Sequence, residues 1–335
     1  MGAFDFVKIF RVNKSISIDL GTANILIYDK QRKKIVLNEP SVVARDRKTG
    51  KLIAVGKEAR EMLGKTPDSI QAIKPLQDGV IADIDSTKEM ITYFIHKIYG
   101  NSLFKPEVMI CVPIEVTSVE RKALFDAVRG AKKTYIIEEG RAAIIGSGVD
   151  ISQPEGSMVI DIGGGSTDIA ILSLDEIIAS KSIRIAGNKF DDDIVKYVKR
   201  KYNLLIGDRT AEKIKKELAS ALEVQNPEIL EIKGRDLESG IPNTVEINAN
   251  EIYEAIEESL FQIVAATKEV LEKCPPELAA DILDNGIIMT GGGSLIKNFI
   301  DMMEKEVGIK VFLSPNPLDS VVLFVVGEMV IGVCI

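Results

Sequence analysis

One stretch of the chain, Ser157–Leu172, constrains its fold more than any other. It reads SMVIDIGGGSTDIAIL, with an apolar run on each side of three consecutive glycines and a serine. Such runs around glycines predict two strands joined by a tight turn. Because glycine has no Cβ, the backbone N–H groups of this turn can approach a polyanion closely and bind it. The pattern favours a phosphate-binding hairpin, although an ordinary glycine-rich hairpin has the same appearance.

Two aspartates, Asp161 and Asp168, flank the glycines. A carboxylate repels phosphate, so its presence beside a phosphate site needs an explanation. A divalent cation between Asp161 and the phosphates would remove the conflict, since Mg²⁺ prefers hard oxygen ligands. We therefore expect a metal–nucleotide site at this hairpin, with Asp168 in a structural role.

The same design occurs again at Ser15–Asp29, which reads SISIDLGTANILIYD. Its segment Ile18–Gly21 aligns with Ile160–Gly163, which indicates an internal duplication of a strand–turn–strand unit. Two facing hairpins can bind the phosphates of one nucleotide from both sides. The duplication makes the metal–nucleotide interpretation the favoured one.

The composition excludes several classes of protein. With 335 residues, 46% of them hydrophobic, the chain can form two domains. Its net charge is −8 and no basic block is dense enough for a general nucleic-acid surface. The three cysteines fit a reducing cytoplasm better than a disulfide framework. No secretory signal is evident, and the apolar run Val321–Ile335 is short and contains Glu328, so we expect a soluble cytosolic protein.

Two short apolar segments are candidates for contact with a membrane surface. Phe4 and Phe6 lie in an N-terminal segment that either packs against the body or lies on a membrane as a short amphipathic piece. Leu103 and Phe104 fall where a loop is expected, and an exposed apolar loop either folds over a core or makes contacts.

Periodicity and end signals predict several helices between the strands. We expect Ser86 with Glu89, and Thr117 with Glu120, to form capping boxes, and Asp208 to cap a third helix. The expected helices are Gly56–Leu63, Ser86–Tyr99, Thr117–Val128, Gly207–Leu222 and Asn250–Lys273.

The segment Ala59–Thr66, AREMLGKT, matches the loosest form of a phosphate loop. A phosphate loop follows a strand and opens a helix, whereas this segment is a helix-like run that ends at Gly64 before Pro67. We therefore reject it as a nucleotide site.

Two other patterns fit a nucleotide site. Glu139 lies where a strand becomes a small-residue helix; it either satisfies the helix dipole or positions water at a phosphate. The strand Ile287–Thr290 runs into Gly291–Gly293 and then a predicted helix, which would let a base or ribose approach the backbone. Glu212 and Lys216 could also be a simple exposed ion pair four residues apart.

Together these patterns resemble the actin, Hsp70 and sugar-kinase superfamily, and within it the MreB/Mbl family of bacterial actin homologues. The resemblance covers nearly the whole chain. It is carried by IDLGTAN (Ile18–Asn24), LNEPSVVA (Leu37–Ala44), IKPLQDGVIADI (Ile73–Ile84), IDIGGGSTDIAIL (Ile160–Leu172), YNLLIGDRTAEKIK (Tyr202–Lys215), PPELAADI (Pro275–Ile282) and TGGG (Thr290–Gly293).

The resemblance implies an α/β fold with two RNase-H-like, actin-like ATPase domains around a nucleotide cleft, each with a smaller subdomain. Domain I would comprise residues 1–147 and 318–335, with its small subdomain at about 33–79. Domain II would comprise residues 148–317, with its small subdomain at about 185–259.

The resemblance also implies a site for ATP and Mg²⁺. Asp19 and Asp161 would hold the metal, largely through water, and Glu139 would orient the attacking water. Ser166 stands where the family usually has Thr, and Gly140 where it usually has Pro, which puts the rate of hydrolysis in question. The remaining implied contacts are Gly21, Thr22, Ala23 and Asn24 at the first phosphate hairpin, Gly163, Gly164 and Gly165 at the second, Glu212 with Lys215 or Lys216 at the ribose and base, Gly292 and Gly293 opposite them, and Leu103 and Phe104 at the membrane.

The implied function is that of an ATP-dependent, membrane-associated cytoskeletal protein that polymerises, helps determine cell shape and hydrolyses ATP slowly. Its partners would be further copies of itself, the inner face of the cytoplasmic membrane and cell-shape membrane proteins. A small-molecule kinase or an Hsp70-like ATPase of the same fold are the alternatives. A kinase should show an Asp base and a sugar-binding insert, and an Hsp70 a peptide-binding domain; we find none of these in the sequence.

Overall fold

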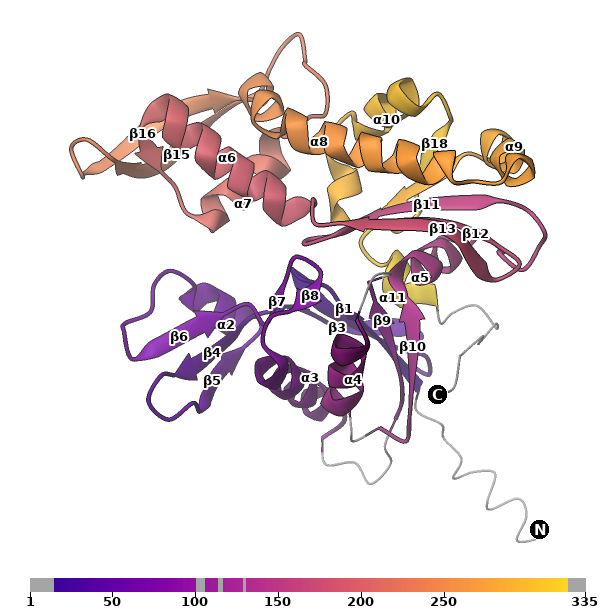
Figure 1. Cartoon of the computed structure of the whole chain (residues 1–335). Coiled ribbons are helices and arrows are strands. Elements are labelled where there is room, and N and C mark those ends of the chain that lie inside the picture. Colours follow the sequence, from indigo (N-terminus) through magenta and orange to yellow (C-terminus); the bar gives the residue numbers. More distant parts are fainter. Residues whose placement is uncertain (1–14, 101–105, 114–116, 129–130, 325–335) are drawn as a thin grey trace, which may run out of the picture.

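A computed structural model describes residues 15–100, 106–113, 117–128 and 131–324 of the chain. Its helices and strands form two halves, which lie one above the other in Figure 1. The expected α/β class is confirmed.

Each half is built on a five-stranded mixed sheet with the same topology. In the first sheet, three antiparallel strands (β1–β2–β3) continue through β1 into the parallel strands β9 and β10. In the second, β11–β12–β13 continue through β11 into β17 and β18 in the same way. The strands are β1 (Ser15–Leu20), β2 (Asn24–Asp29), β3 (Lys34–Pro40), β9 (Glu107–Val112), β10 (Lys133–Glu138), β11 (Ser157–Ile162), β12 (Thr167–Ser173), β13 (Glu176–Ile183), β17 (Ile287–Thr290) and β18 (Val311–Leu313).

This repeated topology places the two predicted hairpins, β1–β2 and β11–β12, at equivalent positions in the two sheets. Most residues of their strands are buried, because helices cover both sides of each sheet. The outer helices are α3 (Ile84–Tyr99) and α4 (Ser118–Ala127) in the first half, and α8 (Ala249–Glu272), α9 (Pro276–Asn285) and α10 (Phe299–Val307) in the second.

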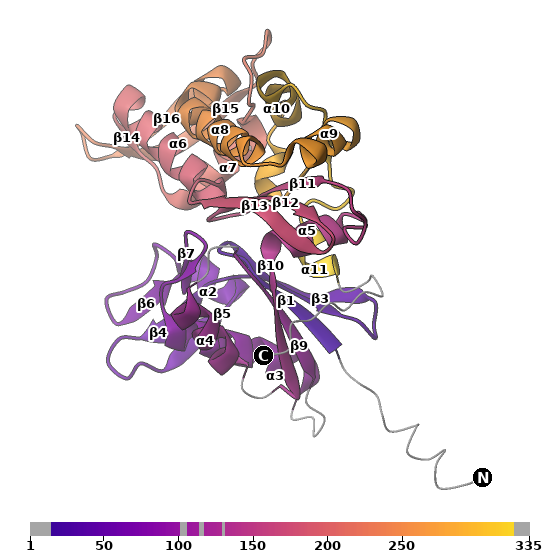
Figure 2. The same ribbon diagram turned by 45° about the vertical axis from the view of Figure 1, so that its right-hand side comes forward.

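Two helices, α5 (Glu139–Gly146) and α11 (Ser320–Leu323), lie between the sheets and join the halves (Figures 1 and 2). Their apolar side chains share one core cluster with residues of both sheets, including Ile137 and Val159. The helices approach so closely that a Cβ on Gly146 would lie 1.8 Å from the carbonyl oxygen of Ser320. Only glycine permits this packing.

Each half also carries a smaller group of elements. In the first half these are β4 (Val43–Asp46), β5 (Leu52–Val55), α2 (Lys57–Met62) and β6 (Ile70–Ile73), followed by the short hairpin β7–β8 (Leu76–Gln77 and Val80–Ile81). In the second they are α6 (Gly187–Tyr202), β14 (Leu204–Leu205), α7 (Asp208–Leu218), β15 (Ile229–Asp236) and β16 (Pro242–Asn248). The domain boundaries proposed above remain a prediction.

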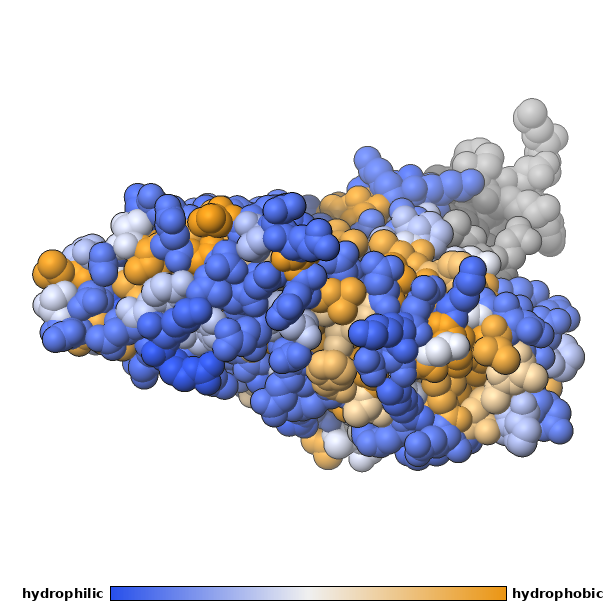
Figure 3. All heavy atoms as spheres, turned by 90° about the horizontal axis from the view of Figure 1, so that it is seen from above, coloured by the Kyte–Doolittle hydropathy of each residue, from blue (hydrophilic) through white to orange (hydrophobic). Residues whose placement is uncertain are grey.

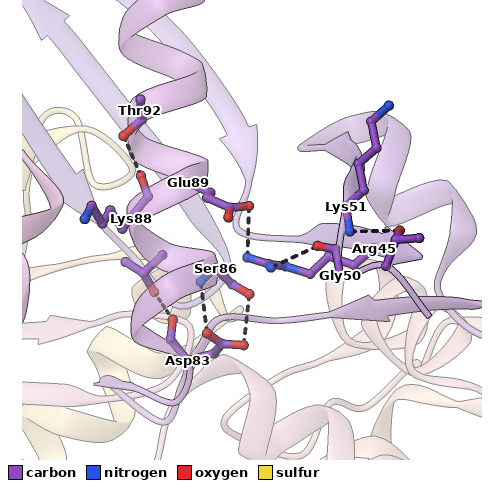
Figure 4. Close-up of polar contacts among 10 residues, drawn as sticks. Arg45, Gly50, Lys51, Asp83, Ser86, Lys88, Glu89 and Thr92 are labelled. Atoms are coloured by element: carbon purple, nitrogen blue, oxygen red, sulfur yellow. Dashed lines mark hydrogen bonds and ion pairs between the residues drawn. The ribbon is translucent and has the colours of Figure 1, made fainter. Parts of the chain in front are cut away.

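Arg45 connects the small sheet of the first half to helix α3. Its guanidinium lies 3.0 Å from the carboxylate of Glu89 and donates to the carbonyl oxygen of Gly50 at 3.3 Å (Figure 4). Glu89 therefore serves as an anchor for β4 and does not cap the helix.

Several predicted helix ends are wrong by a few residues. Helix α3 is capped by Asp83, whose carboxylate accepts hydrogen bonds from the N–H and hydroxyl of Ser86 (Figure 4). Asp208 is the first residue of α7 and caps nothing; the helix ends at Leu218.

The predicted start of helix α4 is correct. The capping box of Thr117 and Glu120 is confirmed, with both of its hydrogen bonds present. After Gly291 the chain forms a short 3₁₀ helix (Gly292–Leu295) before α10 begins. In the described parts of the chain, no helix combines the length and apolar character needed to cross a membrane.

Candidate nucleotide site

The turns of the two duplicated hairpins meet between the halves of the molecule. A Cβ on Gly164 would lie 2.8 Å from the Cβ of Ala23, and one on Gly165 would lie 2.5 Å from the hydroxyl of Thr22. The N–H of Gly163 closes its own turn by donating to the carbonyl oxygen of Ser166 at 2.9 Å. Gly164 and Gly165 therefore form the tip that faces the first hairpin.

A third turn, which the sequence reasoning did not assign to the site, reaches the same place. Asp78 and Gly79 connect β7 to β8 with positive φ at both residues, 49° and 76°, as a two-residue hairpin turn requires. The N–H of Gly79 donates to the hydroxyl of Thr22 at 3.1 Å, and a Cβ on Gly79 would lie 2.8 Å from the hydroxyl of Ser166. The Asp-Gly dipeptide within the segment LQDGVI was the available sequence signal.

Four carboxylates gather beneath these turns. Asp19 and Asp161 occupy equivalent positions near the ends of β1 and β11, Asp168 pairs with Asp161 across the hairpin, and Glu139 begins helix α5. Asp161 and Asp168 are only 6% and 1% exposed. A buried group of like charges is unfavourable unless protons or a cation neutralise it.

The raised pKa values of these carboxyl groups show how unfavourable it is to ionise them together. Burial, and then the charges of Asp168, Asp19 and Asp161, raise the pKa of Glu139 well above its usual value. Burial, followed by Asp168 and Asp19, does the same to the pKa of Asp161. The pKa of Asp19 rises to about 7, mainly through burial and then through the nearby charge of Asp319, which the sequence reasoning did not assign to the site.

This arrangement fits a divalent cation held through water. Within the part of the chain that the structure describes, no three His, Cys, Asp or Glu side chains are arranged to coordinate a metal directly. The clustered carboxylates nevertheless supply the negative charge that a hydrated Mg²⁺ needs. The water-mediated role of Asp19 and Asp161 at a metal stays a prediction.

The residues expected at the ribose and base lie on helix α7. Lys215 donates to Asp191 and to the carbonyl oxygen of Gly187, at 2.8 and 2.7 Å. Glu212 accepts from Lys216 at 2.7 Å and, across the halves, from Arg60. Lys215 thus supports the start of α6 next to the second hairpin, whereas Lys216 is exposed.

Two of the three glycines of the TGGG turn, Gly292 and Gly293, differ in their surroundings. A Cβ on Gly293 would lie 2.2 Å from the side chain of Ile162, so this glycine is needed for packing against β11. A Cβ on Gly292 would meet only Leu318, at 3.4 Å. Gly292 therefore offers the more open approach to a ligand.

The sequence matches the family profile described as MreB/Mbl protein over residues 13–329. This chain belongs to the MreB/Mbl family. The cell shape-determining protein Mbl of Bacillus subtilis (strain 168) is 50% identical over 313 residues, which cover 92% of this chain and 94% of that protein.

Solved structures agree with this membership. MreB5 of Spiroplasma citri bound to ADP has a TM-score of 0.89 at 39% identity, over 94% of this chain and 95% of that one. The MamK double helical filament has a TM-score of 0.80 over 95% of this chain and 99% of that one; at 20% identity it supports the fold alone.

Phe4, Phe6, Leu103 and Phe104, the four proposed membrane contacts, lie outside the described residues. Of the two departures from the family pattern, Gly140 is buried in the first turn of α5, and Ser166 lies against the β7–β8 turn.

The raised pKa of Asp19 predicts a pH-dependent stability for the ligand-free protein. The unfolded chain releases this proton near the usual value of 3.8, whereas the folded protein keeps it up to about pH 7. Between these values the folded state binds more protons, so its stability falls as pH rises, by at most about 1.4 kcal/mol per unit. Urea denaturation in EDTA at pH 5, 6, 7 and 8 should show this fall, and Asp19→Asn should reduce it.

The exposed Asp208→Asn serves as the control and should keep the wild-type pH dependence. Identical slopes for wild type and Asp19→Asn would contradict the placement of Asp19 in a buried acidic cluster.

Proposed function

We propose that this chain binds ATP with Mg²⁺ and assembles into actin-like filaments that take part in determining cell shape. The observation that carries the proposal is the meeting of two hairpin turns, one from each half, above one cluster of carboxylates. Relatives named as cell shape-determining proteins, and MreB5 structures with ADP and AMPPNP, support it. They favour neither a kinase nor an Hsp70-like ATPase.

The phosphates of ATP would lie between the turns at residues 21–24 and 163–165, where backbone N–H groups can donate to them. Bound Mg²⁺ would neutralise charge between the phosphates and the carboxylates of Asp19 and Asp161. With that charge compensated, Glu139 would be ionised and could hold a water molecule as a hydrogen-bond acceptor. Ser166 would offer its hydroxyl at the second turn.

Such a site needs only positioning and charge stabilisation to hydrolyse ATP. We propose a slow ATPase, since Gly140 follows the water-orienting Glu139 and gives the start of α5 more conformational freedom than proline would. Helix α5 begins at Glu139 and ends in contact with α11. Changes at the phosphates can therefore bias how the two halves close.

Assembly would follow from a head-to-tail contact, because a heterologous contact that does not close on itself makes a filament. Exposed apolar side chains are available for it. Ile229 and Ile241, which are 66% and 62% exposed, lie on the β15–β16 hairpin or beside it. Figure 3 shows apolar spheres at the left end of the molecule, over that hairpin, on a face that is mostly hydrophilic.

We also propose that the filament is cytoplasmic and lies at the inner face of the cell membrane, where it meets cell-shape membrane proteins. This part rests on the sequence alone, through the apolar residues Phe4, Phe6, Leu103 and Phe104.

Electron microscopy of the purified protein tests the function directly. Filaments should form with ATP and Mg²⁺ and should be absent in EDTA. Asp161→Ala should lose Mg²⁺-dependent ATP binding and filaments together, because the cation that neutralises the phosphates then loses one of the carboxylates that hold it. The exposed Asp301→Ala is the control and should keep ATP binding. Single particles under all conditions would contradict assembly, and unchanged ATP affinity in Asp161→Ala would contradict the site.

A second experiment tests the role of Glu139. Glu139→Gln keeps the size of the side chain but removes the acceptor charge, so ATP binding should persist while phosphate release slows by roughly a factor of 100. The neighbouring Glu138→Gln should leave the rate nearly unchanged. Equal rates of phosphate release in wild type and Glu139→Gln would remove this residue from the reaction.

A further inference from the structure

An ion pair connects the two halves at a second place, away from the phosphate turns. Arg60 on α2 donates to the carboxylate of Glu212 on α7, although the two residues are 152 positions apart in the sequence. Figures 1 and 2 show α2 and α7 facing each other from the first and second halves. Arg60 belongs to the segment Ala59–Thr66 that was rejected as a phosphate loop.

The charges around this pair are complementary between the halves. Lys74, just after β6, acts on Asp191 of α6 in the second half, and its attraction offsets a small part of the rise that burial causes in the pKa of Asp191. Two cations of the first half, Arg60 and Lys74, thus lie near two anions of the second, Glu212 and Asp191. This pattern favours closure of the halves on this side.

Glu212 can hold Arg60 and still bind a ligand. One carboxylate oxygen accepts from Arg60 and the other from Lys216, but each oxygen has two lone pairs. The side chain remains 27% exposed. A ribose hydroxyl could therefore donate to Glu212 without displacing Arg60.

We propose that the Arg60–Glu212 pair holds the two halves closed over a bound nucleoside di- or triphosphate and slows its release. The inference rests on the proposed nucleotide binding. Arg60 acts through Glu212 and is a positioning residue: the pair must separate before the halves can open and the nucleotide can leave. Because Arg60 is 36% exposed, the pair is of modest strength and is weakened by salt.

Release of a fluorescent ATP analogue, measured by stopped flow with Mg²⁺ at protein concentrations too low for assembly, tests this. Arg60→Ala should release the nucleotide about two- to fivefold faster, while association changes less. Arg60→Lys keeps the charge and should restore most of the slow release. Lys57→Ala removes an equal charge from the exposed start of the same helix and should release at the wild-type rate.

Salt dependence provides a readout that a purely structural role would not move. Raising NaCl should accelerate release from the wild type more than from Arg60→Ala, because only the wild type has the pair to screen. Alanine is a good helix former, so α2 should remain folded in the variant, which circular dichroism can check.

The outcomes separate this inference from the function beneath it. A wild-type protein that binds no nucleotide would overturn both. A wild type that binds nucleotide, but from which Arg60→Ala and Lys57→Ala do not differ in release rate or salt dependence, would overturn only the role of Arg60.

Discussion

The repulsion among Asp19, Glu139, Asp161 and Asp168 is the constraint on which the rest of the structure depends. Duplicated hairpins bring Asp19 and Asp161 to equivalent places, and α5 adds Glu139 from between the sheets. Burial raises the cost of each charge, as the raised pKa of Asp161 and Glu139 shows. Clusters of carboxylates with strongly raised pKa values are typical of functional sites, and this one fits the cation and phosphates of the nucleotide site that we propose.

The turns above the cluster explain why glycine is needed where it is. Gly164 and Gly165 face Ala23 and Thr22 at distances that leave no room for a side chain. Gly79, from the β7–β8 turn, packs equally closely against Ser166. Farther out, the halves are joined by the contact of Gly146 with Ser320 and by the pair of Arg60 and Glu212. The proposed phosphate turns, the α5–α11 contact and the Arg60–Glu212 pair are thus contacts between the same two halves of the molecule.

Sequence reasoning found the parts of the site whose signal is local. Each hairpin has an apolar run on both sides of a glycine-containing turn within one short segment, so both hairpins and their duplication could be predicted. Contacts between distant segments could not: Arg60 meets Glu212, and Asp319 lies near Asp19, with nothing in the local pattern to indicate it. The cap of α3 was misplaced because Asp83 and Ser86 are both good caps three residues apart, and only the fold decides between them.

The most direct test of the account is a crystal structure with Mg²⁺ and a non-hydrolysable ATP analogue. The account predicts the phosphates between the turns at residues 21–24 and 163–165, with the cation beside Asp19 and Asp161. Because Gly164 and Ala23 are now in contact, the turns should also lie farther apart than they do here. Phosphates bound elsewhere, or turns still in contact with each other, would contradict it.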